Sequence, residues 1–329
     1  MQKTVARMLG ALLPIMAMLG PSVAVADTRG SVDISVSVTE FALPPNVQAP
    51  FGISPGPGSS VWFGAGDYVG QVSDRGRVTT YQLPTANAQV GWVTRGPDDA
   101  MWFAERGSNK IGRIDARGRI TEIALPTPDS VPQALVFDRR GRLWYTASEA
   151  NKLGRIDRNG AITEFDVPTP TALPLGMTLG PDNALWFTER SAEQIGRFDL
   201  ARETFTEYAL PAGANPQRIV LGHDGALWFT EFSPSKIGRI TPGGALTEYP
   251  TSSQPVGIVA DAHGLWYAGY NAARIGHLSY GGVPTLEYQV PTPDSRPIQI
   301  ALSRGGNPDL WFTENGANRI GRLQLRHDR

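Results

Sequence analysis

The stretch DGALWFTEFSPSKIGRI, from Asp224 to Ile240, decides the fold because near copies of it recur along the chain. The Trp that is followed by a second aromatic residue occurs at Trp62, Trp102, Trp144, Trp186, Trp228, Trp266 and Trp311, at intervals of 40, 42, 42, 42, 38 and 45 residues. A period near 40 residues is typical of the blades of a propeller. The spacing therefore predicts seven units of one architecture.

Two further segments recur within the units. In six units an IGR-type segment begins nine residues after the Trp, at Ile111, Leu153, Ile195, Ile237, Ile275 and Ile320, and the first unit has VGQV at Val69. A TEY-type segment then begins at Thr79, Thr121, Thr163, Thr206, Thr247 and Leu286, and a fourth short segment leads to the next Trp. These segments are rich in β-branched and aromatic residues and are separated by turn-forming pairs such as Asp224-Gly225. The pattern predicts an all-β, seven-bladed β-propeller with four-stranded blades.

The two ends of the chain complement each other. The seventh unit ends at Leu323 without a TEY-type segment, whereas an unmatched one, Val38 to Phe41, lies near the N-terminus. We expect this N-terminal strand to complete the last blade and close the ring, which would leave no open sheet edge between the first and last blades.

The first residues predict export. Lys3 and Arg7 precede an apolar run from Met8 to Leu19, and Ala24-Val25-Ala26 is a small-x-small cleavage pattern. We therefore expect a signal peptide at residues 1–26, a single propeller domain at 27–329, and a periplasmic or secreted protein. The run is shorter than the roughly 20 residues of a spanning helix, so no membrane span is expected after processing.

Composition excludes several classes of function. The chain has 30 Lys and Arg against 31 Asp and Glu, which does not favour binding to nucleic acid. It has no cysteine, which excludes disulfides, a thiolate nucleophile and cysteine-bound zinc. We predict no cofactor and no metal from the residue pattern.

Residues that recur in most blades are expected to support the architecture rather than chemistry. The Glu of the WFTE-type segment is Glu105, Glu189, Glu231 and Glu314, and the Arg of the IGR-type segment is Arg113, Arg197, Arg239 and Arg322. We predict that these form repeated structural ion pairs. Function is then to be sought in departures from the repeat.

The sequence patterns GPDxALWFTE, NxIGRI and ITEYxLPTP recur over the seven units. In these patterns the chain resembles the virginiamycin B lyase (streptogramin lyase) family, from about residue 36 to residue 325. The resemblance implies a monomeric propeller and a carbon–oxygen lyase. It implies that the ring of a cyclic depsipeptide is opened by magnesium-dependent elimination. In that family, a Pro-His-Gly-Ile pattern on the innermost strand of late blades carries the chemistry.

The sequence departs from that pattern. We align the family's His position with Phe51, Val90, Gln133, Leu175, Gln217, Val256 and Ile298. In the last blade the base position is Ile298 and the magnesium-binding Glu position is Arg296, and in the preceding blade the substrate-binding His position is Val256. The resemblance thus implies magnesium only if the family reaction is retained, and we predict no catalytic residue. The histidines that are present, His223, His263, His277 and His327, lie in turns, an IGR-type segment and the tail, and we predict that none is catalytic.

The odd residues of the inner segments are the candidates for binding. They are Arg218, Gln217, Gln133, Gln299, Arg296, Trp92 and Phe51. Amide, guanidinium and aromatic groups can bind a small molecule or a peptide by hydrogen bonds and stacking. Arg218 is the strongest candidate because we align it with Gly91, Gly176 and Gly257 of other blades.

Three hypotheses remain open at this point. The first is an exported, lyase-like propeller that binds a small molecule or peptide at the channel mouth. The second is an active lyase or lactone-opening enzyme with a relocated site, and the third is a protein-interaction propeller. The alternative to a binding site is that Phe51, Val90, Leu175, Val256 and Ile298 form only an apolar plug.

Overall fold

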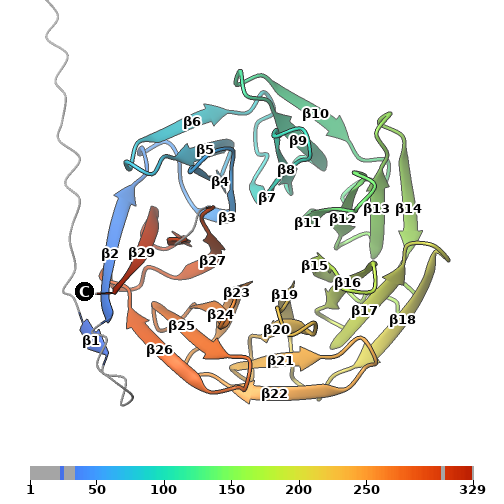
Figure 1. Cartoon of the computed structure of the whole chain (residues 1–329). Coiled ribbons are helices and arrows are strands. Elements are labelled where there is room, and N and C mark those ends of the chain that lie inside the picture. The colour runs from blue at the N-terminus through green and yellow to red at the C-terminus, as the bar shows by residue number, and fades with distance from the viewer. Residues whose placement is uncertain (1–22, 26–33, 305–307, 328–329) are drawn as a thin grey trace, which may run out of the picture.

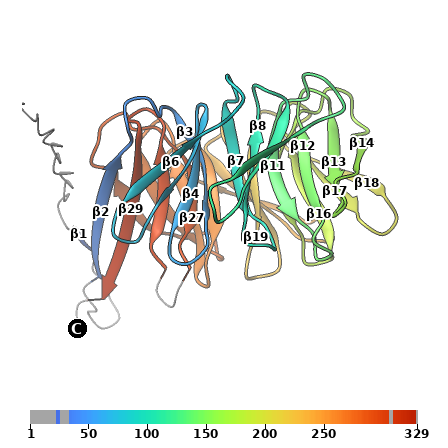
Figure 2. The ribbon, with the colours of Figure 1, turned by 90° about the horizontal axis from the view of Figure 1, so that it is seen from above.

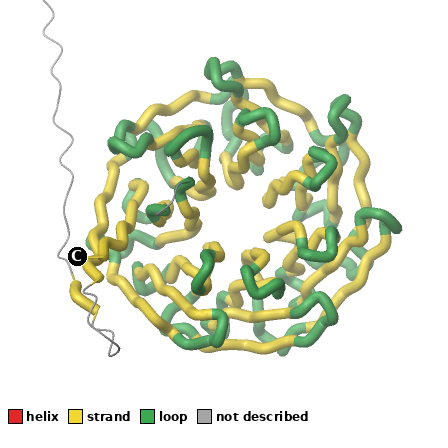
Figure 3. Tube along the Cα trace, in the orientation of Figure 1, coloured by secondary structure: helices red, strands yellow, loops and turns green. Residues whose placement is uncertain are grey.

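The computed structural model describes residues 23–25, 34–304 and 308–327. In this part of the chain, strands joined by loops and turns form seven antiparallel sheets around a central axis (Figures 1 and 3). Turned by 90°, the molecule is a short cylinder about as tall as its strands are long (Figure 2). The predicted seven-bladed β-propeller is confirmed. Within the described residues, no helix has the length and apolar character needed to cross a membrane.

The blades follow one another along the chain, and in each the first strand is innermost. Blade 1 consists of β3 (Pro50–Pro55), β4 (Val61–Ala65), β5 (Tyr68–Val72) and β6 (Val78–Gln82). Blade 2 consists of β7 (Val90–Arg95), β8 (Met101–Glu105), β9 (Lys110–Ile114) and β10 (Ile120–Ala124). Blade 3 consists of β11 (Pro132–Phe137), β12 (Leu143–Ala147), β13 (Lys152–Ile156) and β14 (Ile162–Asp166). Blade 4 consists of β15 (Pro174–Leu179), β16 (Ala184–Glu189), β17 (Gln194–Asp199) and β18 (Thr204–Ala209).

The remaining blades keep the same order. Blade 5 consists of β19 (Pro216–Leu221), β20 (Leu227–Glu231), β21 (Lys236–Ile240) and β22 (Leu246–Pro250). Blade 6 consists of β23 (Pro255–Ala260), β24 (Gly264–Gly269), β25 (Arg274–Ser279) and β26 (Pro284–Gln289). Blade 7 takes β27 (Pro297–Leu302), β28 (Leu310–Glu314) and β29 (Arg319–His327) from the end of the chain and β2 (Ile34–Ala42) from its beginning.

The ring is closed by β2, as predicted. It pairs with β29 in an antiparallel register that runs from Ile34 opposite His327 to Ala42 opposite Arg319. A short strand, β1 (Val23–Val25), adds to the outer edge of β2. The predicted signal peptide, residues 1–26, otherwise lies outside the described residues.

Apolar side chains fill the space between neighbouring blades. At the closure, Phe41 of β2 and Trp311 of β28 pack in one buried cluster with Ile53 and Phe63 of blade 1. Other buried clusters likewise take side chains from two successive blades. Each blade is therefore stabilised by both of its neighbours, so the ring depends on every interface, including the one that joins the chain ends.

The prediction of Glu–Arg pairs between WFTE-type and IGR-type strands is wrong. The register places each Arg opposite the Trp of the neighbouring strand, as in Trp228 with Arg239. The Arg then binds the Asp of the preceding turn, with Arg239 Nε 2.9 Å from Asp224 Oδ2. The Trp228 indole donates to the same carboxylate at 3.0 Å. Equivalent Arg–Asp pairs join Arg113 to Asp98 and Arg197 to Asp182. The ion pair therefore lies at the hairpin turn rather than with the Glu.

The WFTE-type Glu faces a second carboxyl group instead. Glu189, Glu231 and Glu314 are fully buried, and their neighbours on the outer strands are Glu207, Glu248 and Glu40. Burial, followed by the charge of the second carboxylate, raises the pKa of Glu189, Glu231 and Glu314 to about 8. We infer that the buried member of each pair is protonated at neutral pH, because two adjacent buried charges would repel strongly.

Blades 3 and 6 support this interpretation. At the position of the buried Glu, blade 3 has Ala147 and blade 6 has Gly269. Two positions earlier, where the other blades have Phe, these two blades have Tyr145 and Tyr267. The Tyr145 hydroxyl donates to Glu164 at 3.0 Å, and the Tyr267 hydroxyl donates to Glu287 at 3.4 Å. A tyrosine thus supplies the proton donor that a protonated glutamic acid supplies elsewhere.

We predict that Val38→Asp in β2 opens the ring, because Val38 is fully buried at the closure. A buried charge without a partner should lower the free energy of unfolding by roughly 3 kcal/mol. Chemical denaturation and size-exclusion chromatography check the loss of stability and any association through the freed edge. Ser37→Asp, on the other face of β2, is the control, and equal stability of the two variants would contradict the closure.

We predict that the protein loses stability as the pH rises from about 4.5 to about 8, the ordinary and folded-state pKa values of Glu189 and Glu231. The folded state holds protons that the unfolded state releases over this range, so the free energy of unfolding falls with increasing pH. Urea denaturation across the range measures the slope. Glu189→Gln combined with Glu231→Gln should flatten it, whereas Glu149→Gln at an exposed site should not. An unchanged slope in the double variant would show that these carboxyl groups are ionised in the folded protein.

Candidate functional site

Every inner strand is irregular just after it begins. Pairing with the second strand is regular at the first position and again at the fourth, as at Pro216 and Ile219 of β19, with a shift between them. Such bulges redirect side chains locally. The second and third positions of the seven inner strands lie within this bulge, and they carry the residues that differ most between blades.

The register corrects the alignment made from sequence in blade 2. Val90 pairs with Glu105 at the first position, where other blades have Pro, so the second position is Gly91 and the third is Trp92. The third position reads Gly52, Trp92, Ala134, Gly176, Arg218, Gly257 and Gln299 around the ring. Arg218 is thus equivalent to Trp92 and not to Gly91, and the sequence alone missed this because no Pro precedes Gly91.

Threonines of the second strands fix this irregular backbone. Thr230 Oγ1 accepts from the Arg218 backbone N–H at 3.1 Å and donates to the Val256 carbonyl of the next blade at 2.9 Å. At the closure, Thr313 binds the Gln299 N–H at 3.0 Å and the Phe51 carbonyl at 2.9 Å. Each hydroxyl joins two blades and satisfies backbone groups that the bulge removes from the ladder.

Six of the seven second positions, all except Gly91, surround a cavity of about 240 Å³ on the axis, at the end where the inner strands begin. Its lining is Phe51, Arg106, Gln133, Leu175, Arg190, Gln217, Arg218, Phe232, Val256, Tyr270 and Ile298. Most of the wall is apolar, two amides interrupt it, and three arginines provide the charge. The lining contains no carboxylate and no imidazole.

Arg218 is the most unusual of these residues. Its side chain is only 3% exposed, and Nε and Nη1 have no hydrogen-bond partner among the described residues. Its guanidinium carbon lies 4.6 Å from the centre of the Trp92 ring and 5.6 Å from that of Phe51. Burial first, and then the charges of Arg106 and Arg190, lower the pKa of Arg218 to about 9. Arg218 therefore remains a cation at neutral pH, held between two aromatic rings.

The other two arginines reach the cavity from the turns that follow the second strands. Arg106 lies over Phe51 at 4.9 Å, and burial lowers the pKa of Arg106. Its side chain passes over Gly91, where an added Cβ would be 2.6 Å from Arg106 Cδ. Arg190 Nε donates to Asn215 Oδ1 at 3.1 Å, a neutral acceptor. Neither guanidinium is neutralised by these contacts.

The structure brings together most of the predicted binding residues. Phe51, Gln133, Gln217 and Arg218 line the cavity, and Trp92 contacts Arg218 from outside the lining. Arg296 lies outside the lining, with its guanidinium carbon 5.9 Å from the centre of the Tyr270 ring. Gln299 is buried and does not line the cavity.

Sequence reasoning missed Arg106, Arg190, Phe232 and Tyr270. Each directly follows a second strand, at a position that reads Gly66, Arg106, Ser148, Arg190, Phe232, Tyr270 and Asn315 around the ring. This variation is the signal that could have found them. These residues lie in turns, so the pattern of the inner strands does not indicate them.

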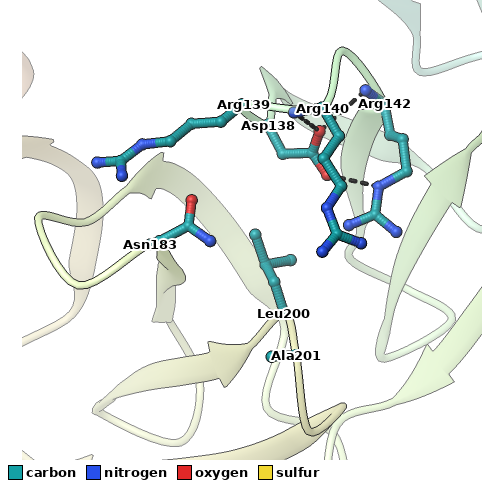
Figure 4. Close-up of a pocket in the computed structure, with 7 residues that line it drawn as sticks. All are labelled: Asp138, Arg139, Arg140, Arg142, Asn183, Leu200 and Ala201. Carbon is teal, nitrogen blue, oxygen red and sulfur yellow. Dashed lines mark hydrogen bonds and ion pairs between the residues drawn. The ribbon is translucent and has the colours of Figure 1, made fainter.

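A second hollow of about 240 Å³ lies beside the turn that joins β11 to β12, among turns of blades 3 and 4 (Figure 4). Asp138 there accepts from Arg142 Nε at 2.6 Å and from the Arg140 backbone N–H at 2.9 Å. Asp138 and Arg142 neutralise each other within one turn. This hollow is therefore explained by the hairpin, whereas the axial cavity gathers the residues in which the blades differ.

No histidine side chain in the described part of the chain lines the cavity. His277 is buried beside Trp266, with Nε2 3.6 Å from Asp261, and so occupies the position of the Arg in the turn pairs of other blades. His223 and His263 lie in exposed turns, and the side chain of His327 lies outside the description. No group of three or more acidic or histidine side chains suited to a metal ion occurs among the described residues.

The fold and the axial cavity define a seven-bladed propeller with a cavity at one mouth of its channel. The profile of the Virginiamycin B lyase family matches residues 23–172 and 128–328. The chain belongs to the virginiamycin B lyase family.

Solved structures agree with this assignment. A streptogramin B lyase is 33% identical, with 88% of this chain and 98% of that chain aligned and a TM-score of 0.84. Virginiamycin B lyase from Staphylococcus aureus is 34% identical, with 88% and 100% aligned and a TM-score of 0.83. The same values hold for its catalytically inactive histidine-to-alanine variant with quinupristin. Hydrazine synthase from Kuenenia stuttgartiensis, at 15% identity and a TM-score of 0.73, shares the fold alone. Comparison with curated proteins gives no match.

We predict that Thr313→Val weakens the cavity mouth at the closure, because the buried hydroxyl satisfies backbone groups of β27 and β3. Loss of both hydrogen bonds should lower the free energy of unfolding by about 1–3 kcal/mol. Denaturant titration measures the change. Thr206→Val, at an exposed outer-strand site, is the matched control, and equal effects of the two substitutions would contradict the bridging role.

Proposed function

We propose that this protein is an exported, lyase-like propeller that binds a small organic molecule or a peptide in the axial cavity and has lost the elimination chemistry of its family. The observation that carries the proposal is the composition of the cavity wall: three arginines, two amides and apolar side chains, without a general base. Such a wall can bind and orient a ligand but cannot accept a proton near neutral pH.

The family's catalytic positions support this proposal. By the alignment with the family pattern, the base position is Ile298 and the substrate-binding position is Val256, and both side chains are in the wall. Neither can exchange a proton. Loss of a general base alone costs roughly 10²- to 10⁴-fold in rate.

The residues present do not fit magnesium. This ion prefers carboxylate, carbonyl and water oxygens. At the family's metal-binding position this chain has Arg296, whose guanidinium lies over Tyr270, and the three arginines of the cavity add further positive charge. A dication would therefore be repelled from this mouth, and we derive no reaction step through it.

We predict that quinupristin stays intact when the protein is incubated with it and magnesium. Elimination would give a linear product of unchanged mass and different retention, and hydrolysis would add one water, so liquid chromatography with mass spectrometry separates the three outcomes. The S. aureus lyase serves as the positive control. A linear product formed by this protein would contradict the proposed loss of elimination activity.

Binding in the cavity is tested separately, with a set of small aromatic acids and amides observed by ligand-detected NMR. Val256→Trp should fill the cavity and abolish the binding signals, because Val256 is part of the wall. Val283→Trp, at a residue that is 61% exposed, is the matched control. Signals that persist in Val256→Trp would place binding elsewhere.

A further inference from the structure

The strongest unexplained feature of the molecule is a buried cation without a counter-ion. Arg218 is almost fully enclosed, yet two of its nitrogens have no partner among the described residues. The charges closest to it are those of Arg106 and Arg190, which are also positive. An unpaired buried charge is costly, and like charges nearby add to that cost.

The aromatic contacts only partly offset this cost. The faces of Trp92 and Phe51 lie 4.6 and 5.6 Å from the Arg218 guanidinium carbon, which is within the range of a cation–π interaction. Phe51 is shared, since Arg106 lies 4.9 Å from the same ring. Two guanidinium groups therefore share one ring, and the cavity wall offers no acid to balance their charge, so an anion in the cavity would stabilise both.

The backbone at Arg218 packs tightly against the preceding blade. In the preceding blade the equivalent residue is Gly176, where an added Cβ would be 2.8 Å from Arg218 Cα and 2.6 Å from the Gln217 carbonyl oxygen. The Arg218 N–H is held by Thr230. Arg218 is thus fixed at the inner end of the cavity.

We propose that the ligand of the cavity is an organic oxyanion, with a carboxylate or phosphate head bound by Arg218, Arg106 and Arg190 and an apolar body against the wall. This rests on the proposed function, because it names the class of ligand for the same cavity. Nε and Nη1 of Arg218 are enclosed and have no partner among the described residues, so the guanidinium lacks a counter-charge, and Arg218 reaches the lining of the cavity in which a head group would lie. Phe232, Leu175 and Ile298 offer the apolar surface for the body.

The experiment compares matched probes. N-acetylphenylalanine carries the carboxylate, benzyl phosphate carries the phosphate, and N-acetylphenylalanine amide is neutral and of nearly the same shape. Isothermal titration calorimetry should give binding of one or both anions and at least tenfold weaker binding of the amide. The two anionic arms decide which head group is preferred. Because phosphate stabilises folded proteins in general, the informative result is a phosphate-induced rise in melting temperature that is larger in the unsubstituted protein than in Arg218→Gln.

Arg218→Gln tests the residue itself. Anion affinity should fall roughly 10- to 100-fold, as expected for a lost charge-assisted hydrogen bond, and the melting temperature without ligand should rise because a strained charge is removed. A purely structural arginine would instead lower that melting temperature. Arg139→Gln, at an exposed arginine in the second hollow (Figure 4), should change neither quantity.

The outcomes separate this inference from the proposed function. Equal binding of the amide and the acids, lost in Val256→Trp, would leave the cavity as the ligand site and overturn the oxyanion head. Unchanged anion affinity in Arg218→Gln would overturn it as well. If no probe binds and inorganic phosphate has no effect that depends on Arg218, both proposals fall.

Discussion

The pairing of β2 with β29 is the constraint on which the rest of the structure depends. Strands from the two ends of the chain complete one sheet, and only then does blade 7 have the face against which blade 1 packs. The interfaces between blades are apolar, so each is stable only while both of its blades are in place. The closed ring in turn holds seven inner strands at fixed positions around the axis. Three arginines can therefore be kept near one another without a neutralising acid.

Repeated polar groups maintain the blades without contributing to the cavity. Outer-strand glutamates such as Glu207 and Glu122 bind the Thr of a connector, as Thr169 and Thr85 show. Such a glutamate also needs a proton donor on its inner side, and a glutamic acid or a tyrosine provides it. Blade 1, where the outer residue is Thr80 and the inner residue is Ala65, lacks both carboxyl groups. The inner and outer residues thus vary together within a single chain, as expected if their function is mutual hydrogen bonding.

The sequence was sufficient for the fold but only partly for the site. A repeated Trp and an unmatched strand at Val38 indicate blade number and closure, because both follow from a period that is visible along the chain. The partner of Glu231 was not predictable in the same way, since the register across strands decides whether Arg239 or Glu248 lies beside it. Arg106 and Arg190 reach the axis from turns, and a linear alignment does not reveal which turns point inward.

The third positions of the inner strands show how one scaffold can acquire a different side chain at the axis without a change of fold. A bulky residue there follows a small one in the preceding blade, as Trp92 follows Gly52 and Arg218 follows Gly176. At both glycines an added Cβ would collide with the backbone of the next blade, so the small residue keeps the two inner strands in close contact while the side chain of the next blade can change. A buried arginine without a counter-charge is expected to cost folding free energy, and the apolar interfaces between blades offset that cost. The oxyanion that we propose as ligand would supply the counter-charge that the fold itself does not provide.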